Sequence, residues 1–279
     1  MSDRLQAGVP VELAPGIRRL VAPNPGLMTG PGTNTYLLGE QEIAVIDPGP
    51  DMAEHVDRIV EVAGAPIRFI LVTHTHRDHS PAVAALKART GAEAIGIAAP
   101  EGSHQDATFT PDHVPADGER LETDEFVVTM LRTPGHASNH VCFLETGSRL
   151  LFTGDHVING STVVINPPDG NMNDYLNSLH RLQDLSIAAI AGGHGELIDN
   201  PYEAIEWLIQ HRLQREAKVI DKLGDRPDAT LDVLVADVYD EIDPAIHGLA
   251  QRSLLAHLIK LEEDGTAATR GDRWRLLEE

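Results

Sequence analysis

The sequence predicts an α/β fold: an αββα sandwich of two packed sheets with helices outside them, followed by a small winged-helix-like domain. Up to about residue 200, short β-like runs alternate with helical stretches, in a β-then-α layout that occurs twice. The rest of the chain predicts helices and then a terminal hairpin, which is typical of a winged unit. We place the boundary so that the domains span residues 1–224 and 225–279.

Turn-bounded apolar runs and helical spacing define the individual elements. The predicted strands are 17–22, 33–38, 43–46, 68–73, 93–98, 126–131, 140–145, 150–153, 162–165 and 187–191. The predicted helices are 51–63, 82–90, 173–185, 202–223, 231–241 and 249–264, and a hairpin at 267–276 turns at Gly271-Asp272. Ser80 and Pro81 form the start signal for the helix 82–90, which Gly91 ends.

Charge and cysteine content limit the partners and the compartment. The chain of 279 residues has 22 basic and 43 acidic residues, a net charge of −21, which repels polyanions at long range. The single cysteine, Cys142, excludes an intramolecular disulfide and suits a reducing compartment. Residues 1–11 lack the apolar run of a signal peptide, and no run approaches the roughly 20 residues of a membrane helix. We therefore expect a cytoplasmic protein without a membrane segment.

Four metal-capable side chains lie within six residues, directly after a predicted strand: His74, His76, Asp78 and His79. On an extended or tightly turning loop, His74 and His76 point to one side and can share a metal, while Asp78 and His79 serve a second. Zinc accepts imidazole nitrogen and carboxylate oxygen at about 2.0–2.2 Å. The alternative is an ordinary polar surface loop, which this spacing at a strand end disfavours.

Together with later motifs, this cluster resembles the signature of the metallo-β-lactamase superfamily over about residues 15–200. The motifs follow β-like runs and occur in the family's order. They are Asp47 in Ile-Asp-Pro-Gly, the stretch Thr73–His79, His136 in Thr-Pro-Gly-His, Asp155 in Phe-Thr-Gly-Asp, and His194 in Gly-Gly-His-Gly. Taken singly, His136 and His194 read equally well as turn histidines, and Asp47 as a turn-forming residue; the set carries the resemblance.

The resemblance implies a site with two divalent cations, for which we expect zinc. It assigns the first metal to His74, His76 and His136, and the second to Asp78, His79 and His194. Asp155 would bridge the two metals, and Asp47 would hydrogen-bond to a ligand or to metal-bound water. We predict Asp78 and Asp47 to be the catalytic carboxylates.

Two such cations, about 3.5–4 Å apart, lower the pKa of a bridging water enough to supply hydroxide at neutral pH. The hydroxide attacks a carbonyl or phosphorus centre, and a metal accepts the developing oxyanion. No protein nucleophile is needed, so we expect Cys142, which lies in an apolar run, to be a core residue. The group that protonates the leaving group stays open; His140 and His156 are weak candidates because only their closeness in sequence supports them.

Details narrow the resemblance within the superfamily. Asp155, where many true metallo-β-lactamases carry Cys or Ser, is similar to the binuclear thioesterases and nucleases. The Asp78-His79 pair departs from the di-iron flavoproteins, and the chain has no room for the inserted domain of the β-CASP nucleases. The stretch 32–36, the turn 192–195 and the helical tail are most similar to the β-lactamase-like protein 2 branch. Some of its members cut single-stranded RNA, and others act on thioesters or show weak lactamase activity.

Our leading hypothesis is a zinc-dependent hydrolase of a small acyl substrate, an ester, thioester or lactam. The alternative is a single-strand endoribonuclease using the same metals, for which Arg270, Arg273 and Arg275 around Trp274 offer a small basic wing. Against it, the tail after residue 210 holds more acidic than basic residues, and we expect Trp274 to pack. A non-catalytic regulatory protein is a third reading, which the intact ligand set disfavours. A homodimer, and a mobile flap formed by residues 23–32, stay open.

Overall fold

The structure of the protein is a computed structural model that describes residues 5–277. The chain forms two compact units. The first contains the residues up to Thr133 together with Asn139–Thr162 and Leu185–Pro201. The second contains Pro134–Ser138, Val163–Asp184 and the residues from Tyr202 onward. No helix among the described residues is long and apolar enough to cross a membrane.

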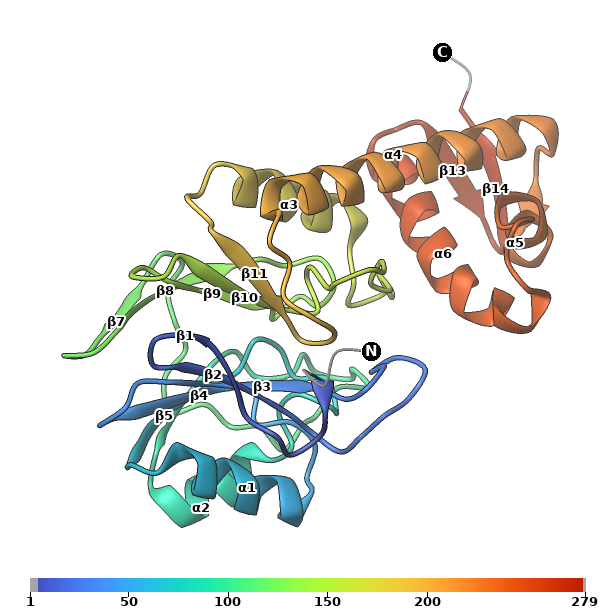
Figure 1. Cartoon of the computed structure of the whole chain (residues 1–279). Coiled ribbons are helices and arrows are strands. Elements are labelled where there is room, and N and C mark those ends of the chain that lie inside the picture. The colour runs from blue at the N-terminus through green and yellow to red at the C-terminus, as the bar shows by residue number, and fades with distance from the viewer. Residues whose placement is uncertain (1–4, 278–279) are drawn as a thin grey trace. The chain divides into compact units, whose positions relative to one another are not determined.

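The first sheet of the first unit has six strands in chain order. They are β1 (Val11–Ala14), β2 (Ile17–Val21), β3 (Asn34–Leu38), β4 (Ile43–Ile46), β5 (Ile67–Leu71) and β6 (Glu93–Ile95). Strands β1–β4 are antiparallel, whereas β4, β5 and β6 run parallel. The parallel connections are the helices α1 (Ala53–Ala63) and α2 (Val83–Thr90), which lie on one face of this sheet (Figure 1). The carboxyl ends of β4 and β5 therefore share one edge.

The second sheet has the strand order β11-β10-β9-β8-β7. Its strands are β7 (Arg120–Glu122), β8 (Val127–Arg132), β9 (Val141–Glu145), β10 (Leu150–Gly154) and β11 (Ala189–Gly192), and only β10 and β11 pair in parallel. The two sheets face each other (Figure 1), and Leu38 and Ile46 of one share a core with Phe143 and Phe152 of the other. Leu37 points instead into the core under α1 and α2, as the alternation of a strand requires.

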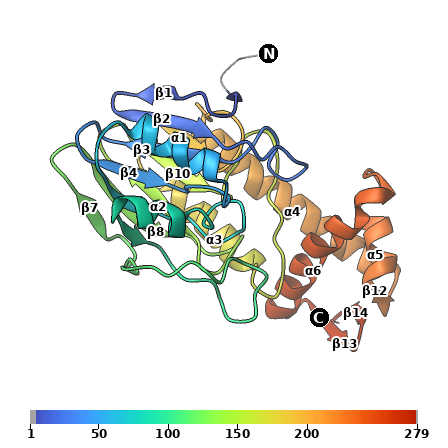
Figure 2. The same ribbon diagram turned by 90° about the horizontal axis from the view of Figure 1, so that it is seen from below.

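The second unit contains most of the helices: α3 (Met172–Gln183), α4 (Pro201–Asp225), α5 (Leu231–Val238) and α6 (His247–Glu263). A short 3-10 helix, Pro244–Ile246, precedes α6. The strands β12 (Ala229–Thr230), β13 (Ala267–Arg270) and β14 (Arg273–Leu276) form a sheet in the order β12-β14-β13. Figures 1 and 2 both show α5, α6 and this sheet gathered at one end of α4. Trp274, Leu234 and Leu258 lie in their common core.

Most of the predicted elements are present, with bounds shifted by a few residues, but several predictions are wrong. Residues 162–165 form no strand, and the sequence reading missed β1, β7 and β12. Ser80 does not cap α2: the N-cap is Ala82, and the Ser80 hydroxyl donates to Asp106 Oδ2 at 2.7 Å. Cys142 is fully buried, as expected for a core residue. The boundary after residue 224 stays a prediction, and it falls one residue before the end of α4.

Candidate metal centre

Every predicted site residue follows the carboxyl end of a strand. Asp47 follows β4, the stretch Thr73–His79 follows β5, and Asp155 and His194 follow β10 and β11. His136 lies in the loop between β8 and β9. Residues at the ends of strands in the two facing sheets thus meet in one region, which is how side chains as distant in sequence as Asp47 and His194 come together.

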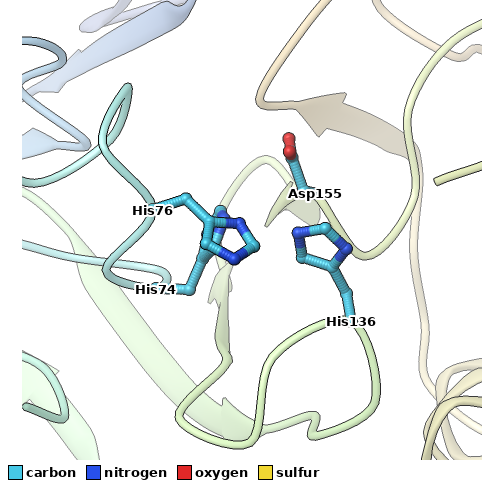
Figure 3. Close-up of side chains that lie close together, drawn as sticks. All are labelled: His74, His76, His136 and Asp155. Atoms are coloured by element: carbon cyan, nitrogen blue, oxygen red, sulfur yellow. The ribbon is translucent and has the colours of Figure 1, made fainter. Parts of the chain in front are cut away.

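The seven predicted ligands form two groups. His74, His76, His136 and Asp155 make the first, and Asp78, His79 and His194 make the second. Within each group, one possible ligand atom of every residue lies within 4.8 Å of the others. Figure 3 shows the first group, with the rings of His74, His76 and His136 pointing toward one another. The grouping is the one that the family resemblance implied.

Asp155 lies against both groups. It belongs to the first, and its Oδ1 is 3.5 Å from His79 Nε2 and 3.3 Å from His194 Nε2 of the second. Asp78 Oδ2 approaches the same two nitrogens at 3.4 and 3.2 Å. Asp155 is therefore the carboxylate that lies next to donors of both groups.

Hydrogen bonds on the outside of the cluster fix four of the histidine rings. The Nδ1 atoms of His74, His79, His136 and His194 lie 3.0, 2.9, 2.8 and 3.3 Å from Thr73 Oγ1, Asp47 Oδ2, Val164 O and Gly32 O. Because carboxylates and carbonyls only accept, Nδ1 carries the proton in the last three, and the Nε2 lone pair is left for a metal. In His74 the result is the same, since the Thr73 hydroxyl already donates to Asp47.

The inner nitrogens fit a metal. Within residues 5–277, the buried Nε2 of His79 makes no hydrogen bond of good geometry, and Asp78 Oδ2 and Asp155 Oδ1 lie 3.4 and 3.5 Å from it. A cation between these atoms would satisfy the nitrogen and both carboxylates. His74 Nε2 and His76 Nδ1 converge to 2.9 Å. A Cβ at Gly193 would lie 2.7 Å from both Asp155 Oδ1 and His79 Cε1, so only glycine leaves this space open. Imidazoles and carboxylates without thiolate suit zinc among the divalent cations.

The charges of the site call for cations. Burial opposes protonation of His79, but Asp78, Asp155 and Asp47 outweigh it and hold its pKa well above the ordinary value. Burial likewise opposes protonation of His194, and Asp155 and Asp78 together raise its pKa to about 10. By contrast, burial and the neighbouring His79 and His76 lower the pKa of His74. Protons on His79 and His194 balance the carboxylates here, a charge that metal ions would supply instead.

Asp47 holds His79 from a constrained position. Its backbone has a φ of 49°, in the left-handed region, at the start of the Asp-Pro-Gly turn. Its Oδ1 accepts from the Thr73 backbone N–H at 2.8 Å, and its Oδ2 accepts from Thr73 Oγ1 at 2.7 Å and from His79 Nδ1. The Thr35 hydroxyl donates to the Asp47 carbonyl at 2.7 Å. The strained turn is thus tied down from three sides.

The start of β3 positions the turn that carries His194. The Asn34 side-chain amide donates to the carbonyls of Gly192 and Gly195, both at 2.9 Å, and the Tyr36 hydroxyl donates to Gly192 O at 2.6 Å. Sequence reasoning used this stretch only as a mark of the family branch and missed its supporting role. Polar residues within a completely buried strand were the signal that could have revealed it.

Other residues singled out in the sequence lie as follows. His140 and His156 are buried, with the ring of His140 stacked on His74 at 5.0 Å, which favours packing behind the ligand. Leu27 and Met28 are exposed at the tip of their segment. Trp274 is 6% exposed within the core of the winged unit, which confirms its packing role.

A family model described as "Metallo-beta-lactamase superfamily" matches residues 28–194. The chain belongs to the metallo-β-lactamase superfamily. It is a hydrolase of this superfamily with histidine and aspartate groups that can hold metal ions. A second model, "Beta-lactamase associated winged helix domain", matches residues 230–274 and identifies the C-terminal sheet and helices.

Among its relatives, the chain is similar over most of its length to proteins named β-lactamase-like protein 2 homologs. It is 32% identical over 267 residues to a protein of Drosophila melanogaster named "Beta-lactamase-like protein 2 homolog", covering 91% of this chain and 90% of the relative. It is 31% identical to an "Atrochrysone carboxyl ACP thioesterase" of Aspergillus fumigatus, over 75% of this chain and 65% of that protein. A solved β-lactamase domain protein from Burkholderia ambifaria superposes with a TM-score of 0.84 at 20% identity, over 99% and 96% of the two chains, and shows the same fold.

Proposed function

We propose that this superfamily hydrolase holds two zinc ions and hydrolyses an acyl thioester by attack of water on its carbonyl carbon, with esters and lactams as related substrates. The proposal rests chiefly on one observation: two groups of histidine and aspartate donors that share Asp155. Such a pair of cations, when bound, makes water acidic enough to ionise at neutral pH and stabilises negative charge on oxygen.

In this proposal, His74, His76 and His136 would hold the first metal, and Asp78, His79 and His194 would hold the second. Asp155 would be shared between the two. The support is the chemistry of the donors and the hydrogen bonds that leave Nε2 of four rings directed inward. Asp47 acts through His79 by fixing its ring and its proton, and Thr33 Oγ1, 3.4 Å from Asp78 Oδ2, orients the carboxylate.

Three observations favour attack on a carbonyl over attack on a phosphodiester. Relatives of 31% and 33% identity are named as thioesterases. The net charge of −21 works against a polyanionic strand, and the Trp274 ring is not available for stacking on bases.

Single-strand RNA cleavage is the second candidate, and the basic side chains of the winged unit favour it. Three exposed arginines, Arg270, Arg273 and Arg275, lie on the hairpin of the winged unit. Phosphate contacts of this kind would make binding fall steeply with added salt.

The test is a parallel assay of zinc-loaded protein with an acyl thioester, a β-lactam and single-stranded RNA, coupled to elemental analysis. His76→Ala should abolish the activity, since it removes a donor of the first metal. His104→Ala is the matched control, because His104 is exposed and outside both groups. Thioester turnover that His76→Ala removes and His104→Ala keeps supports the proposal. RNA cleavage with the same mutant pattern and no thioester turnover replaces it with the second candidate.

A further inference from the structure

The loop that carries His136 is held by the segment that follows it in the second unit. His136 Nδ1 donates to Val164 O at 2.8 Å. Two neighbouring carbonyls of the loop are also bound: Gly135 O accepts from the Asn171 backbone N–H at 2.9 Å, and Pro134 O accepts from Ser178 Oγ at 2.8 Å. The position of the His136 ring therefore depends on the positions of residues 163–178.

Arg212 of α4 binds that segment at the point where it touches His136. Its side chain is 3% exposed, and its Nη2 donates to Val163 O at 2.5 Å, one peptide before the carbonyl that His136 uses. Residues 162–165 form no strand, so no ladder of backbone hydrogen bonds holds these carbonyls in place. A buried guanidinium bound to one of them does so instead, because a charge-assisted hydrogen bond is stronger and more directional than a neutral one.

A second route leads from Arg212 to the same loop. The guanidinium carbon lies 5.4 Å from the centre of the Tyr175 ring. Tyr175 is fully buried, and its backbone packs so closely on Gly135 that a Cβ there would lie 2.3 Å from Tyr175 Cα. Gly135 has a φ of 140°, so its place in the loop also requires glycine. Arg212 thus contacts Tyr175, which packs on Gly135, and Val163, the neighbour of the residue that binds the His136 ring.

We propose that Arg212 is a positioning residue for His136, and that it sets the affinity of the first metal without affecting the second. This inference rests on the proposed ligand assignment, in which Asp78, His79 and His194 hold the second metal. The outer hydrogen bonds of His79 and His194 go to Asp47 and Gly32, which are remote in sequence from α4. Loss of Arg212 should therefore weaken binding of the first metal and leave the affinity for the second unchanged.

Arg215 offers a matched control on the same helix. It donates to a backbone carbonyl, Val238 O, at 2.6 Å, and its guanidinium lies 4.2 Å from the centre of the Tyr239 ring. Both arginines donate to a backbone carbonyl and lie over a tyrosine ring, and Arg215 also forms an ion pair with Glu241. The contacts of Arg215 lead to the end of α5 and the residues after it, and not to the His136 loop. A general loss of stability in the second unit would appear when either arginine is replaced. An effect that acts through His136 would appear only when Arg212 is replaced.

The experiment measures zinc per chain and both zinc affinities, by elemental analysis and competition with a chelator, for the wild type, Arg212→Met, Arg212→Lys, Arg215→Met and His136→Ala. Arg212→Met should weaken one zinc about tenfold or more, the lower end of what loss of an outer hydrogen-bond partner costs. Arg212→Lys, which keeps the charge but not the planar fork, should recover part of the loss. Arg215→Met should bind both ions as the wild type does.

A double mutant identifies the metal concerned. In a His136→Ala background, Arg212→Met should cause no further loss, because its effect passes through the ring already removed. Additive losses, or unchanged zinc affinities in folded Arg212→Met, overturn the inference. If Arg212→Met does not fold, Arg212→Lys decides in the same way: one weakened zinc supports the inference and two unchanged affinities overturn it. A wild type that binds no zinc would refute the proposed function itself.

Discussion

Replacing Asp47 by asparagine tests whether the site depends on the partner of His79. The carboxylate accepts three hydrogen bonds, from the Thr73 backbone N–H, Thr73 Oγ1 and His79 Nδ1, at 2.8, 2.7 and 2.9 Å. An amide keeps only one oxygen. Whichever way it turns, its NH₂ group meets at least one of these buried N–H donors, because asparagine supplies two donors at one end.

The cost follows from that count. Leaving a buried donor without an acceptor costs about 1–3 kcal/mol. Loss of a hydrogen-bond partner behind a metal-binding histidine typically weakens metal affinity about 10- to 100-fold. The free-energy cost and the loss of metal affinity agree, since a tenfold change in affinity corresponds to about 1.4 kcal/mol. We therefore expect Asp47→Asn to weaken one zinc by one to two orders of magnitude and to leave the chain folded.

The assay is zinc competition with a chromophoric chelator, with circular dichroism to confirm folding. Asp51→Asn is the matched control, because Asp51 lies in the same turn region and is exposed. Folded Asp47→Asn with both zinc affinities equal to those of Asp51→Asn would refute the reasoning.

Three further predictions concern other parts of the chain. Gly193→Ala should lose zinc because its methyl group would lie 2.7 Å from Asp155 Oδ1. Gly248→Ala is the control, because Gly248 lies in α6 with open space around its Cα. It should bind zinc normally and match or exceed the wild-type stability in urea unfolding. Burial lowers the pKa of His257 to about 4, with Glu216 opposing, so its contribution to stability is present above pH 6.5 and is lost as pH falls toward 4. The metal-free wild type should thus lose about 2 kcal/mol more between pH 7 and pH 5 than His257→Phe does, measured by urea unfolding; equal losses would contradict this. Cys142, which is fully buried, should react with a thiol reagent only after unfolding, and fast labelling of the native chain would count against the core assignment.

The chain sequence determined the parts of this protein that depend on local pattern. Turn-bounded apolar runs predicted most strands of both sheets, and glycine stops predicted the ends of α1 and α2. The motif residues were recognisable because metal ligands need particular side chains directly after strands. These features are local in the sequence, so they can be read without knowing which segments meet in space.

Apart from Asp47, the residues that hydrogen-bond to the candidate ligands from behind became known only from the tertiary structure. Nothing local marks Val164 as the partner of His136, or Asn34 as the support of the turn before His194, because these contacts join segments 28 and 158 residues apart. The apolar run 162–165 read as a strand, yet its carbonyls bind His136 and Arg212 instead of a neighbouring strand. An apolar pattern records that a segment is buried. Which partner satisfies its backbone depends on the packing of the whole fold.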